Sequence, residues 1–286
     1  MPISLHHLRV GEASRWAVRG DAGWAWLDGT LADLLAMPLD ETRAMVTAAA
    51  DKATGDSLGD GPLPPVDRQE VWAAGVTYQR SREGRREESG HASVYDGVYA
   101  SERPEIFFKA NPWRVVGDGE AVGVRADSTW DVPEAEVGLV VNAGGDIVGY
   151  TLGNDMSSRS IEGENPLYLP QAKVYDRSCA LGPAVVPAWV AGPGPFEIGM
   201  RVLRDGREAY GGTTSTSAMA RGFAELTGWL FRGLSFPAGV VLLTGTGIVP
   251  GADFTAQPGD TVEIRCPVLG TLTNPVVAVG TGGGTR

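Results

Sequence analysis

The sequence has few of the residues that build disulfide frameworks, zinc sites and histidine-based catalytic centres. It holds two cysteines, Cys179 and Cys266, and three histidines in 286 residues. Neither cysteine belongs to a CxxC pair or has a histidine close by in the sequence. We therefore expect two buried thiols rather than a zinc site or a disulfide.

Long hydrophobic runs and a leader are also missing. No apolar run approaches the roughly 20 residues that a membrane-spanning helix needs. The first residues, MPISLHHLRVGEASRW, do not show the basic and then apolar order of a signal peptide. We therefore expect a cytoplasmic protein with no membrane partner.

Positive charge is scarce. The chain carries 24 Lys and Arg against 35 Asp and Glu, for a formal net charge of −11. Such a chain repels phosphate backbones, so nucleic acid is not an expected partner. With 43% hydrophobic and 21% charged residues, it has the composition of an ordinary globular protein.

Glycine and proline, by contrast, are plentiful. Dispersed between short β-branched runs, the 40 glycines and 19 prolines predict many short strands joined by tight turns. We expect a small N-terminal domain over residues 1–65 and a catalytic domain over residues 66–286, because GDGPLPPVD has the composition of a linker. The small domain would hold a hairpin that turns at Gly20 and a helical stretch over 31–53, whose second part is capped by Asp40.

The larger part is dominated by predicted strands, with one clear helix over residues 218–233. The fold class is therefore α+β and strand-dominated. Residues 81–102 are polar and then aromatic without a clear period, which fits either a helix or a mobile flap. The strands are predicted at 71–78, 105–110, 137–141, 147–153, 184–190, 196–206, 239–247 and 260–279.

Two of these strands bring carboxylates together. Glu134 and Glu136 point to the same face of one strand, and Asp155 shares a face with small residues on the next. Placing the apolar faces on one side sets a hairpin register with Val141 opposite Val148. This register puts Asp155 opposite Glu134, so that three carboxylates converge.

Three carboxylates so close together either raise one another's pKa or bind a cation. Oxygen ligands favour a hard ion, Mg²⁺ or Mn²⁺, with Ca²⁺ also compatible. The alternative is that Glu134 and Glu136 lie on a solvated strand face. Convergence with Asp155 favours the metal site.

Around these carboxylates the chain resembles the fumarylacetoacetate hydrolase superfamily. That superfamily has an ExE motif followed by Asn-Asp-x-Ser-x-Arg, here residues 154–159, then a Lys-x-x-Asp motif at Lys173 and a late Gly-Thr pair at residues 245–246. The resemblance covers residues 72–279. It implies a mixed β-sandwich roll, here with a small N-terminal α/β appendage, a divalent metal, a 2-oxo acid substrate and a homodimer or homotetramer.

Two longer segments, YDGVYASERPEIFFKA and SSRSIEGENPLYLPQAKVYDRSCALGP, are similar to the branch of this superfamily that dehydrates 2-keto-3-deoxy sugar acids in pentose degradation. This similarity implies a hydro-lyase that converts 2-keto-3-deoxy-D-arabinonate to 2,5-dioxopentanoate. The hydrolases of the superfamily carry a catalytic His in an Asn-Tyr-x-x-His pattern, where this chain has Ser81. Unless His91 folds in from the flap, the missing His disfavours hydrolysis and leaves elimination.

In such an elimination the metal would chelate the carboxylate and the 2-keto oxygen of the substrate and stabilise an enolate. A base would remove a C3 proton, and an acid would assist departure of the C4 hydroxyl. We expect Lys173 to transfer the proton, Glu162 to act as acid or base, and Ser81 to hydrogen-bond a substrate hydroxyl. The alternatives are an ion-pairing role for Lys173 and a surface position for Glu162.

Further side chains are expected to bind the substrate. Arg82 would meet its carboxylate, although RSREGRREE is also typical of a solvated helix. Thr246 would hold the carboxylate in a Gly-Thr-Gly turn, whose alternative is a tight turn that merely needs glycine. The expected substrate-binding residues are Tyr78, Arg82, Lys109, Tyr168, Gln171 and Thr246.

Other functions stay open at this point. A carbon–carbon hydrolase or acylpyruvase on the same scaffold would need His91 as a replacement base. An isomerase or decarboxylase of aromatic breakdown would use the same metal site. A binding protein that has lost catalysis would keep the carboxylates but would not need Lys173 or Thr246.

Overall fold

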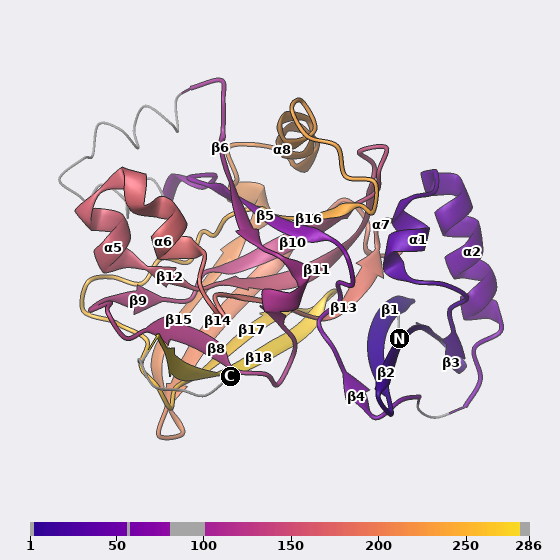
Figure 1. Ribbon diagram of the computed structural model, residues 1–286, viewed down its shortest axis with the longest axis horizontal. Coiled ribbons are helices and arrows are strands. Elements are labelled where there is room, and N and C mark those ends of the chain that lie inside the picture. Colours follow the sequence, from indigo (N-terminus) through magenta and orange to yellow (C-terminus); the bar gives the residue numbers. More distant parts are fainter. Residues whose placement is uncertain (1–2, 56–57, 81–100, 281–286) are drawn as a thin grey trace.

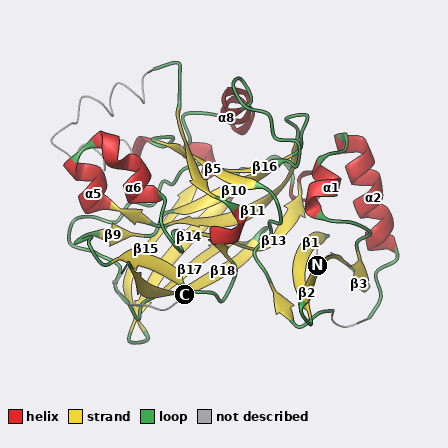
Figure 2. Cartoon of the chain, viewed as in Figure 1, coloured by secondary structure: helices red, strands yellow, loops and turns green. Residues whose placement is uncertain are grey.

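The computed structural model describes residues 3–55, 58–80 and 101–280. Strands form its centre (Figure 1), and helices lie at its edges (Figure 2). The expected α+β, strand-dominated class is confirmed. The possible flap at 81–102 lies outside the described residues except for its last two positions. Among the described residues, no helix is long and apolar enough to cross a membrane.

The N-terminal segment begins with a strand that joins the main sheet, where Leu5 pairs with Val185. The predicted hairpin follows and turns just after Gly20. The proposed boundary between residues 1–65 and 66–286 therefore stays a prediction. The strands of this segment are β1 (Ser4–Val10), β2 (Ala13–Gly20), β3 (Gly23–Trp26) and β4 (Gly61–Pro62).

The helical stretch that follows divides into α1 (Leu31–Leu35) and α2 (Leu39–Asp51). Thr30 starts α1 with a capping box. The expected role of Asp40 as N-cap is wrong, because Pro38 occupies the cap position of α2 without a side-chain hydrogen bond. Asp40 lies in the first turn, where its negative charge still favours the positive end of the helix dipole.

The main sheet is mixed, as the resemblance implies. Its strand order is β3-β2-β1-β13-β11-β10-β16-β5-β6, with β4 beside β1 and β7 beside β13. The β16–β5 and β13–β7 pairs are parallel, and the others are antiparallel. The strands not yet introduced are β5 (Glu70–Gly75), β6 (Glu105–Ala110), β7 (Val115–Val116), β10 (Ala135–Val141), β11 (Ile147–Asp155), β13 (Cys179–Pro187) and β16 (Val240–Leu243).

A second sheet has the order β15-β14-β17-β18-β8, and a small ladder joins β12 to β9. These elements are β8 (Val122–Arg125), β9 (Asp131–Val132), β12 (Ser157–Ser158), β14 (Glu197–Arg204), β15 (Arg207–Ser215), β17 (Thr261–Cys266) and β18 (Gly270–Val279). The remaining helices are η1 (Pro112–Arg114), α5 (Arg159–Glu164), η2 (Pro166–Tyr168), α6 (Leu169–Lys173), α7 (Ala188–Ala191), η3 (Thr216–Ala218) and α8 (Phe223–Leu230).

Three predicted elements end earlier or begin later than expected. The strand at 184–190 stops at Pro187, after which the chain turns into α7. The helix at 218–233 shortens to α8, which begins after Gly222. The strand at 71–78 stops at Gly75, because Val76 takes a φ of 53° that no extended strand accommodates.

The core lies on both faces of the main sheet. On one face, Val137 and Leu139 of β10 belong to the same buried cluster as Ile264 of the second sheet. On the other face, Val140 shares a cluster with Leu35 of the N-terminal helices. Strand β10 is therefore buried on both sides. Its polar side chains need hydrogen-bond or ionic partners within the protein.

The hairpin register that brings the carboxylates together is confirmed over most of its length. Ala135 pairs with Asn154 and Val140 with Gly149, as the predicted register requires. A bulge then shifts the pairing beyond Val140. It places Val148 in the core beside the N-terminal helices rather than with Tyr150 and Leu152, because one extra residue turns a side chain to the opposite face.

Candidate metal centre and active site

Three buried carboxylates meet where β10 begins and β11 ends. The backbone N–H of Asp155 donates to the Glu134 carbonyl oxygen at 3.0 Å, which ties the strand ends together. One ligand oxygen from each of Glu134, Glu136 and Asp155 lies within 4.8 Å of the others. The structure thus brings together all three predicted metal ligands.

Glu136 is the carboxylate that most needs a cation. Burial, and then the negative charges of Asp155 and Glu134, raise the pKa of Glu136 well above its usual value. Its Oε2 accepts a hydrogen bond of 2.5 Å from Gly245 N, and within the described part of the chain no Lys or Arg pairs with it. These oxygen donors fit a hard divalent ion, which would remove the repulsion.

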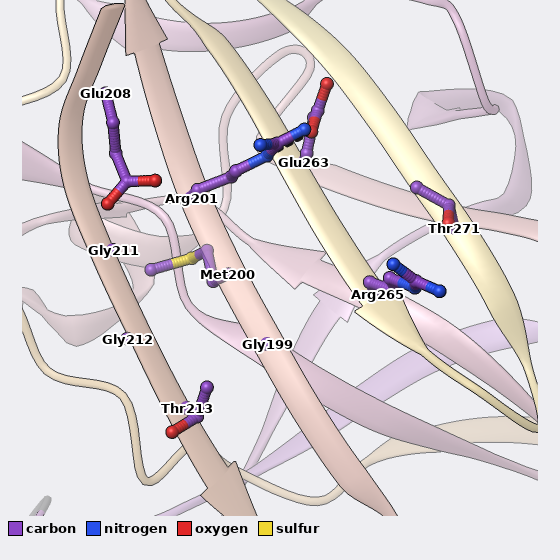
Figure 3. A pocket seen from close by; sticks show the side chains of 10 residues that line it. All are labelled: Gly199, Met200, Arg201, Glu208, Gly211, Gly212, Thr213, Glu263, Arg265 and Thr271. Carbon is purple, nitrogen blue, oxygen red and sulfur yellow. Dashed lines mark hydrogen bonds and ion pairs between the residues drawn. The ribbon is translucent and has the colours of Figure 1, made fainter.

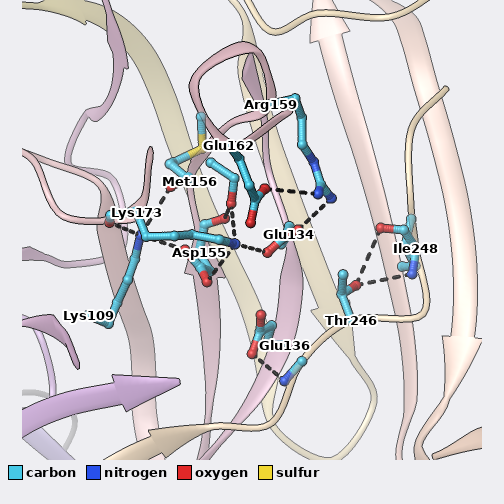
Figure 4. A network of polar contacts seen from close by, with 12 residues as sticks. Lys109, Glu134, Glu136, Asp155, Met156, Arg159, Glu162, Lys173, Thr246 and Ile248 are labelled. Atoms are coloured by element: carbon cyan, nitrogen blue, oxygen red, sulfur yellow. Dashed lines mark hydrogen bonds and ion pairs between the residues drawn. The ribbon is translucent and has the colours of Figure 1, made fainter. Parts of the chain in front are cut away.

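Lys173 closes one side of this carboxylate group (Figure 4). It lies at the C-terminus of α6 and is only 1% exposed. Its Nζ donates to Glu134 Oε2, to Asp155 Oδ2 at 3.1 Å and to Ser157 Oγ at 2.6 Å. The predicted proton-transfer residue therefore contacts two of the three candidate metal ligands.

Arg159 connects Glu162 to the same group. Ser158 caps α5, and Arg159 is the first residue of this helix. Arg159 Nη2 lies 2.6 Å from Glu134 Oε1, and its Nη1 lies 3.2 Å from Glu162 Oε2. Glu162 is buried, so the alternative of a surface carboxylate is wrong.

Lys109 completes the charge balance. Its ammonium lies 2.5 Å from Asp155 Oδ1. Together the four carboxylates Glu134, Glu136, Asp155 and Glu162 face the three cations Lys109, Lys173 and Arg159. One formal negative charge is left, and a divalent cation would turn it into one positive charge suited to a 2-oxo acid anion.

Two further predicted residues, Thr246 and Tyr78, are buried in the same part of the structure. Thr246 is buried and accepts a hydrogen bond of 3.1 Å from Ile248 N, next to the Gly245 N–H that meets Glu136. Tyr78 is also buried, and this burial, followed by the charge of Glu136, raises its pKa.

Two predicted residues are not brought into contact with the carboxylates. Tyr168 on η2 is 37% exposed, and Gln171 on α6 is exposed, with its backbone oxygen accepting from Arg125. Ser81, Arg82 and His91 lie outside the described residues. The roles of all five stay predictions.

Two residues of the site carried no role in the sequence interpretation. Ser157 bonds Lys173, and Arg159 joins Glu134 to Glu162. Both belong to the Asn-Asp-x-Ser-x-Arg motif, so their spacing from Asp155 was the available signal. The motif alone does not show that Ser157 contacts Lys173 or that Arg159 contacts Glu134 and Glu162.

A hollow of about 660 Å³ lies elsewhere, on the outer face of the second sheet (Figure 3). Glycines form much of its floor, and Arg201 and Glu263 pair across it at 2.5 Å. Its lining residues include none of the predicted site residues. Its two basic and two acidic side chains balance, so it offers no charge preference for a small anion.

The fold and the carboxylate group together define a divalent-metal enzyme of mixed β architecture. The chain matches the family model "Fumarylacetoacetate (FAA) hydrolase C-terminal" over residues 71–277. It therefore belongs to the fumarylacetoacetate hydrolase family.

Similar proteins include two dehydratases. A probable 2-keto-3-deoxyxylonate dehydratase of Haloferax volcanii is 49% identical over 250 residues, 87% of this chain and 86% of that protein. A 2-dehydro-3-deoxy-D-arabinonate dehydratase of Saccharolobus solfataricus is 43% identical over 217 residues, 74% of this chain and 73% of that protein.

A solved structure of 2-keto-3-deoxy-D-arabinonate dehydratase, complexed with magnesium and 2,5-dioxopentanoate, has a TM-score of 0.82 and 34% identity. The match covers 96% of this chain and 99% of that chain. These relatives confirm the expected enzyme class, a divalent-metal-dependent hydro-lyase.

Proposed function

We propose that this enzyme removes water from a 2-keto-3-deoxy-pentonate and forms 2,5-dioxopentanoate. The observation that carries the proposal is the buried group of Glu134, Glu136 and Asp155 with the Lys173 ammonium placed directly on it. The two dehydratase relatives supply the substrate class.

The relatives' two substrate names do not conflict. Dehydration at C2 and C3 of the parent sugar acid erases the configuration of both carbons. A 2-keto-3-deoxy acid from D-xylonate and one from D-arabinonate are then the same molecule, with one stereocentre at C4. We propose the C4 configuration of the D series for this chain, as in the Saccharolobus relative.

Magnesium is the ion that fits the site, and Glu134, Glu136 and Asp155 would hold it. Bound there, it would supply a Lewis acid for the 2-oxo acid end of the substrate. The chain's own contribution is a buried group in which three cations contact the carboxylates. Thr246, which follows the glycine that donates to Glu136, and the buried Tyr78 are proposed to orient the substrate carboxylate.

Proton movement is proposed for Lys173 and Glu162. The C3 proton would pass to the neutral amine of Lys173, whose Nζ lies against Glu134 and Asp155 and which a divalent cation on these carboxylates would favour over the ammonium. Glu162, held by Arg159, would deliver a proton to the departing C4 hydroxyl. After water has left, C3 regains a proton and C5 gives up a C–H proton, which forms an enol between C4 and C5. C4 then gains a proton while the C5 hydroxyl loses its own, which yields the aldehyde.

The test is a direct assay of purified protein with Mg²⁺. We would offer 2-keto-3-deoxy-D-pentonate, oxaloacetate and an acylpyruvate in separate reactions. Formation of 2,5-dioxopentanoate that EDTA and Glu134→Gln both abolish would support the proposal. Pyruvate release from the acylpyruvate alone would overturn it in favour of hydrolysis, and would make His91 the next residue to change.

Tautomerisation of oxaloacetate is a separate outcome. An oxaloacetate tautomerase of Bacillus subtilis is 27% identical to this chain over 191 residues, which makes oxaloacetate a substrate worth offering. Oxaloacetate turnover without any dioxo product would overturn the dehydratase proposal. It would leave the metal centre itself intact.

A further inference from the structure

Lys109 is one of the largest fully buried side chains of the described residues. It extends from β6 and has no solvent exposure. A buried ammonium is strongly disfavoured unless protein oxygens replace its water shell. We therefore looked for the protein oxygens that replace this water shell.

Three oxygens lie within bonding distance of Lys109 Nζ (Figure 4). They are Asp155 Oδ1 at 2.5 Å, the Met156 carbonyl oxygen at 3.0 Å and the Lys173 carbonyl oxygen at 2.5 Å. The two backbone carbonyl oxygens accept hydrogen bonds from Nζ, and Asp155 Oδ1 is its ion-pair partner. With a side chain of no solvent exposure, the ammonium is thus surrounded by protein.

The three acceptors come from two separate elements. Asp155 ends β11 and Met156 follows it directly, whereas Lys173 ends α6. The last carbonyls of a helix have no partner within that helix. Lys109 thus satisfies a carbonyl that α6 leaves open and fixes the end of α6 against the end of β11.

Each carboxylate oxygen of Asp155 has a lysine beside it. Lys109 lies on its Oδ1, and Lys173 lies 3.1 Å from its Oδ2. Lys109 also bonds the backbone of Lys173. The same ammonium therefore holds a candidate metal ligand and the residue placed for proton transfer in one fixed relation.

We propose that Lys109 is a positioning residue that sets Asp155 and Lys173 in register, and that it does not contact the substrate. This departs from its expected substrate-binding role, because its ammonium is fully buried against Asp155 and two backbone carbonyl oxygens. The part that concerns Asp155 stands on geometry alone. The part that concerns proton transfer rests on the proposed function.

Charge alone would have the opposite effect on metal affinity. Removing a positive charge beside Asp155 leaves the carboxylate group more negative, which would tighten binding of a divalent cation. Losing a positioning contact loosens the ligand, and loss of such a supporting group typically weakens metal binding about 10- to 100-fold. The sign of the change in affinity therefore separates the two roles.

The experiment compares Lys109→Met with the wild type by calorimetric titration of Mn²⁺ and Mg²⁺ alone. Asn274→Leu is the matched control, because Asn274 is fully buried and donates to the Gly117 and Glu120 carbonyls at 2.9 Å, away from the carboxylate group. Lys109→Gln is the second variant, in case Lys109→Met does not fold. Thermal unfolding shows that each variant is folded.

We expect Lys109→Met to bind the metal about tenfold or more weakly and, at saturating Mg²⁺, to lower kcat with little change in KM. Asn274→Leu should lower the stability of the protein but leave its metal affinity and its kcat unchanged. Equal or tighter metal binding with a raised KM and an unchanged kcat would overturn the proposal and make Lys109 a substrate ligand. If the wild type lacks dehydratase activity, only the proposed function fails, and the titration still decides the positioning role.

Discussion

The backbone N–H of Gly245 donates a hydrogen bond of 2.5 Å to Glu136 Oε2. Gly245 has a φ of +85°, and a Cβ there would lie 2.1 Å from Thr77 Oγ1. Glycine is required on both counts. The turn after β16 therefore reaches Glu136 only because this residue has no side chain.

Replacing Gly245 by Ala should destabilise the protein and displace Glu136. The left-handed backbone alone is strained for Ala by about 1–2 kcal/mol, and the contact with Thr77 adds to this. Chemical unfolding and a metal titration measure the two effects. Gly206→Ala is the control, with a φ of +74° and nothing near its Cβ. An equal loss of stability in the two variants would mean that the contact with Thr77 has no effect on stability.

Replacing Glu136 by Gln should abolish stabilisation by Mg²⁺. A ligand at about 100 times its Kd stabilises the folded protein by about 2.7 kcal/mol, which thermal unfolding with MgCl₂ and with EDTA detects. Without metal the variant should be at least as stable as the wild type, since a buried, repelled carboxylate is gone. Glu263→Gln, in the exposed pair with Arg201, should keep the full Mg²⁺ effect. The same Mg²⁺ shift in all three proteins would argue against this metal site.

Replacing Lys173 by Met should remove the proposed proton transfer. We expect kcat for the 2-keto-3-deoxy-pentonate to fall about 10²- to 10⁴-fold, the usual range for a general acid or base. Lys52→Met serves as the control, because Lys52 is an exposed residue at the end of α2. A kcat within a few-fold of the wild type would leave Lys173 with its ion-pairing role only.

Asp131 should make stability depend on pH. Burial raises its pKa from 3.8 to about 6, against the effects of a Ser128 hydrogen bond and the Arg125 charge. Since the folded pKa is above the unfolded one, the stability that the protonated group contributes is lost as pH rises from about 4 to about 6. Asp131→Asn should then be about 1–2 kcal/mol more stable than the wild type above this range, and equal to it below.

Unfolding in denaturant at the two pH limits measures this difference. Asp127→Asn provides a control of opposite sign, because the Arg125 hydrogen bond lowers the pKa of Asp127. That variant should lose a little stability above its pKa rather than gain it. A lower stability of Asp131→Asn at both limits would contradict the prediction.

Much of the carboxylate site could be predicted because it is a local property of one hairpin. Strand alternation fixes the faces of Glu134 and Glu136, and apolar matching fixes the register that brings Asp155 opposite. The bulge at Val148 could not be predicted in the same way. It depends on packing against the N-terminal helices, which the local pattern does not contain.

The sequence by itself determined the fold class, the family motifs and the convergence of three carboxylates, since these follow from short-range periodicity and spacing. Only the tertiary structure decided what surrounds them. Lys109 reaches Lys173 from a strand 64 residues away, and Gly245 reaches Glu136 across 109 residues. Such contacts are set by how sheets and helices pack, so no spacing along the chain could reveal which protein oxygens surround Lys109.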